Sequence, residues 1–375
     1  MDLTPDEAQR DLVTLAARIL GDATDRGTPG GQLWGVLGDA GLLGVAVPDD
    51  LGGLGLGFAE VGLVLEEAGK VAATVPVLEC GTAAVVIGRL DTGKRRDPLL
   101  SGLAAADVVF GLALGEPAGD PLTPLVCAAG DHGRWSLTGS KLCAPSDPPA
   151  THLLVSAHVA GVGPRLLLLE AGRDGIQVGA GMVRFDGVPI GVDDVLGDLG
   201  DPRGVPLAVR CATAGACSVM AGAMSHVVRL TAEYTRTREQ FGRPIGTFQA
   251  VGQRAADAFT AAWAIELTAR QACWHLAEGD SEPGAGAEAA TAVAKYTAAT
   301  AGTEVIRAAH HLHGGIGLDR DYPLHRYTML AKKLELLLGG ASEQAVLLGD
   351  VLARAAIRAA ADAAPVGTAT TAGSA

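Results

Sequence analysis

The amino-acid sequence predicts an α+β protein with an N-terminal α-helical domain, a small middle β-barrel or sandwich domain and a C-terminal four-helix bundle. Three observations predict this order. Apolar residues recur at helical spacing near the N-terminus, short apolar runs separated by turn residues fill the middle, and long Ala-rich stretches follow Pro206. The chain has 375 residues, of which 48% are hydrophobic, so it can bury a large core over two or three domains.

The N-terminal helical domain is expected over residues 1–106. Ala16, Ile19 and Leu20 repeat at the spacing of one helix face. The Gly-rich segment Leu51–Gly57 interrupts the pattern. It lacks the preceding strand and the following acidic residue of a dinucleotide-binding loop, so we interpret it as a connection between helices.

The middle β domain is expected over residues 107–202. Apolar runs at 108–114, 153–157 and 165–170 are bounded by Gly, Pro and Asp, which is typical of strands joined by turns.

The C-terminal four-helix bundle is expected over residues 203–358, because long Ala-rich stretches suit close antiparallel packing. The four predicted helices are Leu207–Thr237, Ala250–Glu278, Gly286–Leu312 and Pro323–Arg358. Residues 359–375 are small and polar at their end and are expected to form a disordered tail.

Charge and cysteine content narrow the class of protein. The net charge of −13 speaks against nucleic acid as a partner, since binding phosphates requires a basic face. The six cysteines form no CxxC pair, and the acidic N-terminus does not resemble a signal peptide, so a cytoplasmic protein is expected. The uncharged span Cys211–Val228 is rich in Ala, Gly and Ser, which favours a buried helix over a membrane span.

Two segments of the C-terminal domain carry the strongest functional signal. The first, Arg238–Gln249, reads Arg-Glu-Gln-Phe-Gly-Arg-Pro-Ile-Gly-Thr-Phe-Gln. The second, His311–Tyr327, opens with His-Leu-His-Gly-Gly-Ile-Gly. Both resemble the flavin-adenine contact segments of the acyl-CoA dehydrogenase family. With the order of domains, the resemblance extends over nearly the whole chain, to Arg358.

The resemblance implies FAD as the cofactor, placed between the β domain and the bundle, with a second subunit holding its adenine half. Arg238 matches the arginine that pairs with the pyrophosphate, a role that suits the two-pronged guanidinium. His311 stands where the family more often has Gln. The other implied cofactor contacts are Gln240, Phe241, Ile245, Gln249, Leu312, Gly314 and Gly315.

A metal site offers a competing interpretation, because His310, His311, His313 and His325 lie close in sequence. The spacing and glutamate of a helical zinc motif are missing, so no metal is expected.

The family's catalytic glutamate has no counterpart at either of its usual positions. Counting without gaps places Leu338 at the position that follows the last motif, and Ala212 at the position on the first bundle helix. Neither side chain can accept a proton. Glu335 and Glu343 lie near Leu338, but a small alignment shift brings neither onto its position easily. We therefore expect no catalytic residue in this chain.

The β domain also departs from the family where the flavin ring would lie. Gly115 replaces a hydroxyl-bearing residue, and Cys143–Pro145 replaces an aromatic strand segment. Such losses remove the groups that hold and tune the ring. Glu116, Pro117 and Lys141 are expected to preserve turn and strand geometry only.

This pattern resembles the non-base subunit of the heteromeric acyl-CoA dehydrogenases of actinobacteria, many of which act on steroid side-chain thioesters. It implies α,β-unsaturated acyl-CoA as the product, a homologous catalytic subunit as partner, FAD shared with that partner, and an acceptor like electron-transfer flavoprotein. The helices at 207–237 and 323–358 would form the subunit interface. A self-sufficient homotetramer with a displaced base, a non-redox binding subunit, and a lyase on the same scaffold stay open as alternatives.

Overall fold

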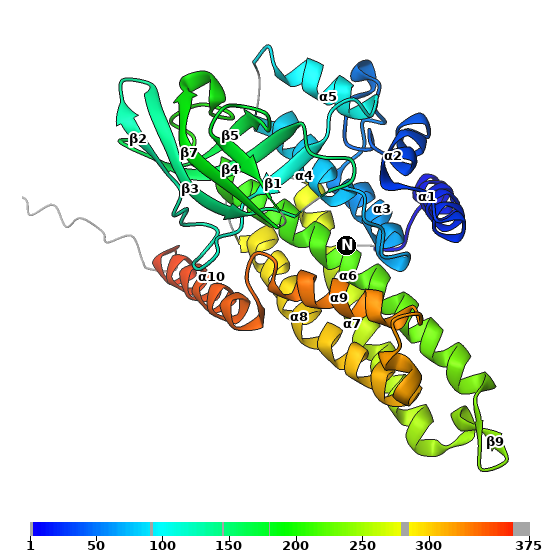
Figure 1. The fold of residues 1–375 in the computed structure, drawn as a ribbon. Helices are drawn as coiled ribbons and strands as arrows, with labels where there is room; N and C mark the ends of the chain where they lie inside the picture. The colour runs from blue at the N-terminus through cyan, green and yellow to red at the C-terminus, as the bar shows by residue number, and fades with distance from the viewer. Residues whose placement is uncertain (1–2, 91–92, 145, 180, 279–284, 363–375) are drawn as a thin grey trace, which may run out of the picture.

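The computed structural model describes residues 3–90, 93–144, 146–179, 181–278 and 285–362. Its order of elements confirms the predicted fold class: helices, then strands, then long helices (Figure 1). Two predicted features lie partly outside the described residues. They are Pro145, from the segment expected beside the flavin ring, and residues 363–375 of the expected tail.

The described part of the N-terminal region contains five α-helices: α1 (Glu7–Arg26), α2 (Gly30–Asp39), α3 (Phe58–Lys70), α4 (Val77–Leu90) and α5 (Arg96–Ala104). The Gly-rich segment is a connection between helices, as predicted, and it ends at Gly57, the N-cap of α3. A Cβ on Gly53 would lie 2.0 Å from the carbonyl oxygen of Val47, so only glycine fits this turn.

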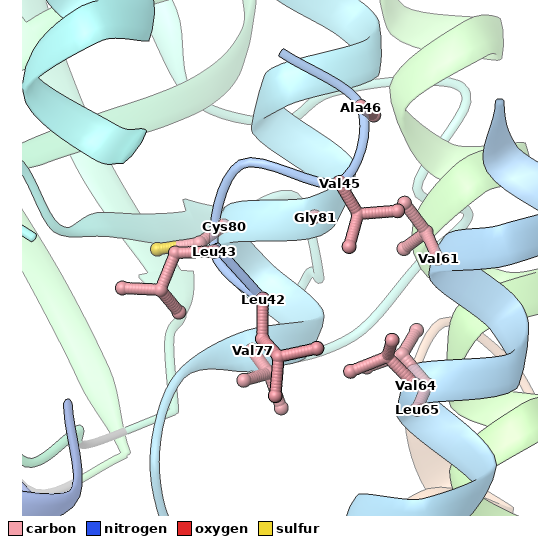
Figure 2. Close-up of a pocket in the computed structure, with 10 residues that line it drawn as sticks. All are labelled: Leu42, Leu43, Val45, Ala46, Val61, Val64, Leu65, Val77, Cys80 and Gly81. Atoms are coloured by element: carbon pink, nitrogen blue, oxygen red, sulfur yellow. The ribbon is translucent and has the colours of Figure 1, made fainter. Parts of the chain in front are cut away.

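The same region contains a small apolar cavity of about 20 Å³ between α3, α4 and the segment that follows α2 (Figure 2). Its lining is apolar apart from the thiol of Cys80, whose pKa burial raises well above its usual range. A void of this size and chemistry is a packing defect of the core and offers no groups for catalysis.

Within the described residues, seven strands form one sheet, in which β4 pairs with β1 and β2 along one edge and with β5 along the other. The strands are β1 (Phe110–Ala113), β2 (Cys127–Asp131), β3 (Arg134–Leu142), β4 (His152–Val159), β5 (Gly163–Glu170), β6 (Ile176–Val178) and β7 (Met182–Gly191).

The two faces of β4 and β5 pack against different partners. Leu154 and Leu166 join the core of the helical regions, whereas Leu153 and Leu167 join a second core with Phe185 and other residues of the β domain. Burial on both faces explains the continuous apolar runs of β4 and β5, while β3 and β7 alternate buried and exposed residues.

The C-terminal region consists of α6 (Gly204–Thr237), α7 (Gln249–Glu278), α8 (Ala285–His313), α9 (Leu324–Leu336) and α10 (Ala341–Asp362). By length and composition alone, α6 and the stretch 324–358 could cross a membrane. The apolar window of α6 is 94% buried inside the protein, as in a core helix, and the second stretch is interrupted.

The prediction of one helix from Pro323 to Arg358 was wrong. The chain breaks between α9 and α10, because Leu338 and Gly339 have φ angles of 57° and 99°, which no right-handed helix accommodates. α10 then packs against α8 and continues to Asp362, beyond the predicted end.

Candidate cofactor-binding site

The first predicted segment forms a small hairpin where α6 ends. β8 (Glu239–Gln240) and β9 (Arg243–Pro244) are joined by Phe241 and Gly242, whose φ angles are 54° and 77°. This two-residue turn with two positive φ angles is the type I′ arrangement that suits a hairpin. Phe241 is 92% exposed, so its ring projects from the protein in a strained backbone conformation.

The residues after the hairpin hold it against the bundle. The Ile245 N–H donates to the Arg238 carbonyl oxygen at 2.8 Å, and the half-buried Ile245 begins a short 3₁₀ helix, η3 (Ile245–Thr247). The Arg243 guanidinium lies 4.2 Å from the centroid of the Phe248 ring, and Phe241 meets that ring edge-on at 6.1 Å. Gln249 then opens α7.

The second predicted segment lies where α8 ends and a 3₁₀ helix, η4 (Gly314–Leu318), begins. Gly314 has a φ of 62°, and a Cβ on Gly314 or Gly315 would have open space around it. His311 is exposed, but Leu312 is buried in the bundle. Because the Leu312 side chain is buried, a contact with a cofactor has to come from its backbone. The sequence alone did not show this.

His313 of the second segment packs against the end of α6, the helix that leads into the first segment. Its ring stacks on that of Tyr234 of α6, with centroids 4.6 Å apart and planes at 21°. The side-chain nitrogens lie 2.8 Å from the Ala309 carbonyl oxygen and 2.9 Å from the Tyr322 hydroxyl. Burial lowers the pKa of His313, which favours the neutral ring.

These segments form one end of the bundle, the tip, on the side away from the sheet, where β9 marks it in Figure 1. Within the described part of the chain, the side chains of Arg238, Gln240, Gln249 and His311 are exposed and make no hydrogen bond. A free guanidinium, two amides and an open glycine backbone fit the phosphate and adenine half of FAD.

The histidines that suggested a metal site serve separate contacts. His310 meets the Thr328 hydroxyl at 2.8 Å, and His325 meets the Tyr322 carbonyl oxygen at 2.9 Å. Among the described residues, no group of three His, Cys, Asp or Glu side chains converges.

At the opposite end of the bundle, Leu338 occupies the turn between α9 and α10. It is 7% exposed. The buried Lys295 ammonium donates to the carbonyl oxygens of Leu334 and Glu335 at the end of α9, and the Gln344 amide donates to the Leu338 carbonyl at 3.3 Å. Ala212, at the other family base position, is buried within α6.

Glu335 is not a free base. Its carboxylate accepts hydrogen bonds from Lys332 at 2.6 Å and Thr303 at 3.0 Å. Burial acts to raise its pKa, but these bonds and the nearby ammonium groups outweigh burial and hold the pKa below its usual value.

A cavity of about 550 Å³ lies beside Leu338, between α6, α8, α10 and the loop after β1. Sequence reasoning missed it, because its walls come from segments far apart in the chain. The Thr213 side chain lines it and makes no hydrogen bond with any described residue. Glu343, also in the lining, accepts the Gly340 N–H at 3.1 Å.

Among the described residues expected beside the flavin ring, Gly115 and Cys143 offer no hydroxyl group. Gly115 and Leu142 pair backbone to backbone, and Cys143 is buried. Nearby, Lys141 forms a fully buried ion pair with Glu116 and donates to the Ser156 hydroxyl at 2.8 Å. Burial lowers the pKa of Lys141, while Glu116 raises it. The ion pair links the segment after β1 to β3, and the Ser156 hydrogen bond links β3 to β4.

With this fold and these segments, the chain belongs to the acyl-CoA dehydrogenase family. Residues 6–107 match the model of the acyl-CoA dehydrogenase N-terminal domain, and residues 203–357 match that of the C-terminal domain. Members are oxidoreductases that act on CH–CH bonds with FAD as the cofactor, which confirms the predicted class and cofactor.

Two relatives from Mycobacterium tuberculosis are similar over most of their length. The chain is 35% identical to acyl-CoA dehydrogenase FadE27, over 92% of each chain, and 34% identical to FadE28, over 84% of this chain and 91% of that one. Among solved structures, the Tcur3481–Tcur3483 steroid ACAD variant has a TM-score of 0.84 and 35% identity, covering 94% of this chain and 99% of that one. The ChsE4–ChsE5 complex from M. tuberculosis has a TM-score of 0.84 and 34% identity, with the same coverage.

Proposed function

We propose that this chain is the non-base subunit of a heteromeric acyl-CoA dehydrogenase, and that its bundle tip holds the adenine half of FAD bound by a homologous catalytic subunit. The product would be an α,β-unsaturated acyl-CoA. The chain would work in the cytoplasm, with an acceptor like electron-transfer flavoprotein taking the electrons.

The arrangement of the tip carries this proposal. Arg238, Gln240 and Gln249 are exposed and lie in or beside the β8–β9 hairpin, and β9 marks the end of the bundle away from the chain's own β domain (Figure 1). Arginine and amide groups that make no hydrogen bond with the described residues of their own chain are suited to a ligand supplied from outside it. A flavin held across two subunits is therefore a better fit than one held within this chain.

The chemistry assigns the missing groups to the partner. Dehydrogenation needs a carboxylate to remove the proton α to the thioester, while the flavin accepts a hydride from the β carbon. Leu338 and Ala212 cannot take the proton, and Glu335 is already engaged as an ion-paired carboxylate. The catalytic base and the bed of the flavin ring would come from the other subunit.

A steroid side-chain thioester is the proposed substrate class. One structural relative, Tcur3481–Tcur3483, is a steroid acyl-CoA dehydrogenase (ACAD), and another is the complex of ChsE4 with ChsE5. This similarity supports both a bulky acyl group and a mixed assembly.

The test is to purify the chain alone and together with a homologous subunit that retains the glutamate. Alone, the chain should be colourless and should not reduce dye with acyl-CoA; together, the complex should contain FAD and reduce dye. If the chain alone carries one FAD per subunit and oxidises thioesters, the proposal is wrong. If the complex contains no FAD, a non-redox binding subunit becomes the better description.

One observation favours a second candidate, a self-sufficient dehydrogenase with a displaced base. Glu343 lines the cavity of about 550 Å³ beside Leu338, so a carboxylate lies near one of the family's base positions. In that case Glu343→Gln should abolish dye reduction by the isolated chain. Under the leading proposal, the isolated chain is inactive with either residue.

A further inference from the structure

We propose that His313 is a positioning residue that fixes the Arg238 hairpin and the Gly314–Gly315 turn in one arrangement, so that the tip grips a nucleotide as a single unit. This inference rests on the proposed function, because it concerns how the same cofactor contacts are held. Nothing in the sequence motif by itself requires a histidine to touch α6.

Three segments meet at the His313 ring. Tyr234 from the last turns of α6 stacks on one face, and the ring of Tyr322, which precedes α9, lies 5.2 Å away at 56°. The backbone of α8 supplies the third contact, at Ala309. His313 is 3% exposed and directly precedes Gly314, so a shift of its ring moves the glycine turn.

The hydrogen bonds fix the protonation of the ring. A carbonyl oxygen only accepts, so Nδ1 must carry the proton that reaches Ala309 at 2.8 Å. In the neutral ring Nε2 is then an acceptor, and the Tyr322 hydroxyl at 2.9 Å donates to it. Both bonds have one direction, which gives the ring one orientation.

The stack reaches Arg238 through the backbone. The Tyr234 carbonyl oxygen accepts the Arg238 N–H at 2.8 Å, and the Arg238 carbonyl oxygen accepts the Ile245 N–H at 2.8 Å. Tyr234 therefore holds His313 with its ring and Arg238 with its backbone. Removing the imidazole should loosen both cofactor segments relative to each other.

The experiment measures the rate of FAD loss from the assembled two-subunit complex, followed by the rise in flavin fluorescence after dilution. His313→Ala should raise this rate about tenfold, since two hydrogen bonds of ordinary strength are lost. Tyr322→Phe removes one hydrogen bond and keeps the aromatic ring, so it should raise the rate by roughly threefold.

His313→Gln is the rescue variant. Its amide can donate to Ala309 and accept from Tyr322, so it should restore most of the FAD retention. If His313→Ala does not assemble, Tyr322→Phe alone decides the outcome.

His226 provides the matched control. It lies on α6, and its ring stacks on Tyr327 with centroids 4.7 Å apart and planes at 16°. Its Nδ1 accepts a hydrogen bond from the Arg229 guanidinium at 3.0 Å. His226→Ala should reduce stability in a similar way and leave the rate of FAD loss unchanged. An equal increase in both variants would overturn the inference, because general loosening of the bundle would then be the cause.

A double-variant comparison separates this inference from the proposed function. If His313 acts through the placement of Arg238, adding His313→Ala to Arg238→Ala should increase the rate of FAD loss little further. Fully multiplicative effects would overturn the positioning role and leave the proposed function standing. No effect of Arg238→Ala itself would contradict the proposed function.

Discussion

The two ends of the C-terminal bundle differ in how their polar groups are satisfied. At the tip, Arg238 and Gln240 are exposed and make no side-chain hydrogen bond with any residue in the described part of the chain. At the end near the β domain, Lys295 and Gln344 are buried and bind backbone carbonyls around Leu338. The polar groups at the tip are open to an external ligand, whereas Lys295 and Gln344 are engaged with the backbone around Leu338, beside the cavity of about 550 Å³.

This difference indicates which end of the bundle binds a ligand and which end stabilises the fold. Buried polar groups that satisfy one another stabilise a fold, whereas exposed groups arranged on a strained turn are more often arranged for a ligand. We therefore expect substitutions near the β domain to change stability, and substitutions at the tip to change cofactor binding. The following predictions test that separation.

The largest effect is expected from Lys141→Met in the β domain. Lys141 and Glu116 have fully buried side chains, so the substitution leaves a buried carboxylate without its charge partner. Loss of one member of a buried pair destabilises a protein by roughly 3–5 kcal/mol. Urea unfolding should show this loss, while FAD content per assembled complex stays unchanged.

The control replaces both members of the pair. Lys141→Met with Glu116→Gln removes both charges and keeps an oxygen to accept the Leu125 N–H, which lies 2.9 Å from Glu116. Its loss of stability should be clearly smaller. If Lys141→Met lowered FAD content per complex, the chain's own β domain would be holding the flavin and the comparison would fail.

Arg238→Ala should have the next largest effect, on cofactor binding. A hydrogen bond to a charged group contributes roughly 1.5–3 kcal/mol, so FAD affinity of the mixed complex should fall by roughly 10- to 150-fold. Equilibrium dialysis measures it, and urea unfolding should show little change. Arg236→Ala, an exposed arginine on the last turn of the same helix, is the control. Equal losses in both variants would indicate a general charge effect.

Much of the fold was predictable because its signals are local. Repeats of apolar residues predicted helices, and runs bounded by Gly and Pro predicted strands such as β4 and β5. Gly339 and Gly340 are a helix-stop signal that the prediction of one continuous helix passed over. The left-handed conformation of Leu338 itself has no sequence signature. It depends on Lys295 and Gln344, which reach the turn from α8 and α10.

The candidate site was predictable in its residues but not in its geometry. Arg238 and the glycines at 314 and 315 stood out by resemblance, and their role as cofactor contacts stays a prediction. That Leu312 is buried and that His313 stacks on Tyr234 follow from how α6 and α8 cross. The cavity lined by Thr213 and Glu343 could not be predicted, because its walls come from distant segments.

Phe241→Asn should change stability and cofactor binding in opposite directions, each by a smaller amount. Phe241 has a φ of 54° and is 92% exposed, so the fold gains little from the ring and carries the backbone strain. Asparagine tolerates this conformation, so the isolated chain should become more stable by about 0.5–1 kcal/mol. FAD retention or subunit affinity should fall at the same time. A gain in both would show that the ring has no role at the tip.

The smallest effect is a pH dependence of stability from His226, which lies away from both ends. Burial, and then the charge of Arg229, lowers the pKa of His226 from 6.5 to about 4, with Arg326 lowering it and Glu233 raising it by less. In this range the unfolded chain binds more protons than the folded one, so the free energy of unfolding falls as pH drops from about 6.5 to about 4. Above about pH 6.5 the His226 ring is neutral in both the folded and the unfolded chain, so this loss of stability is absent.

His226→Phe keeps an aromatic ring beside Tyr327 and should flatten the pH slope in urea unfolding, while FAD retention at neutral pH stays unchanged. The same slope in both proteins would contradict the assignment, and a change in FAD retention would mean that the tip depends on the middle of the bundle more than its contacts indicate.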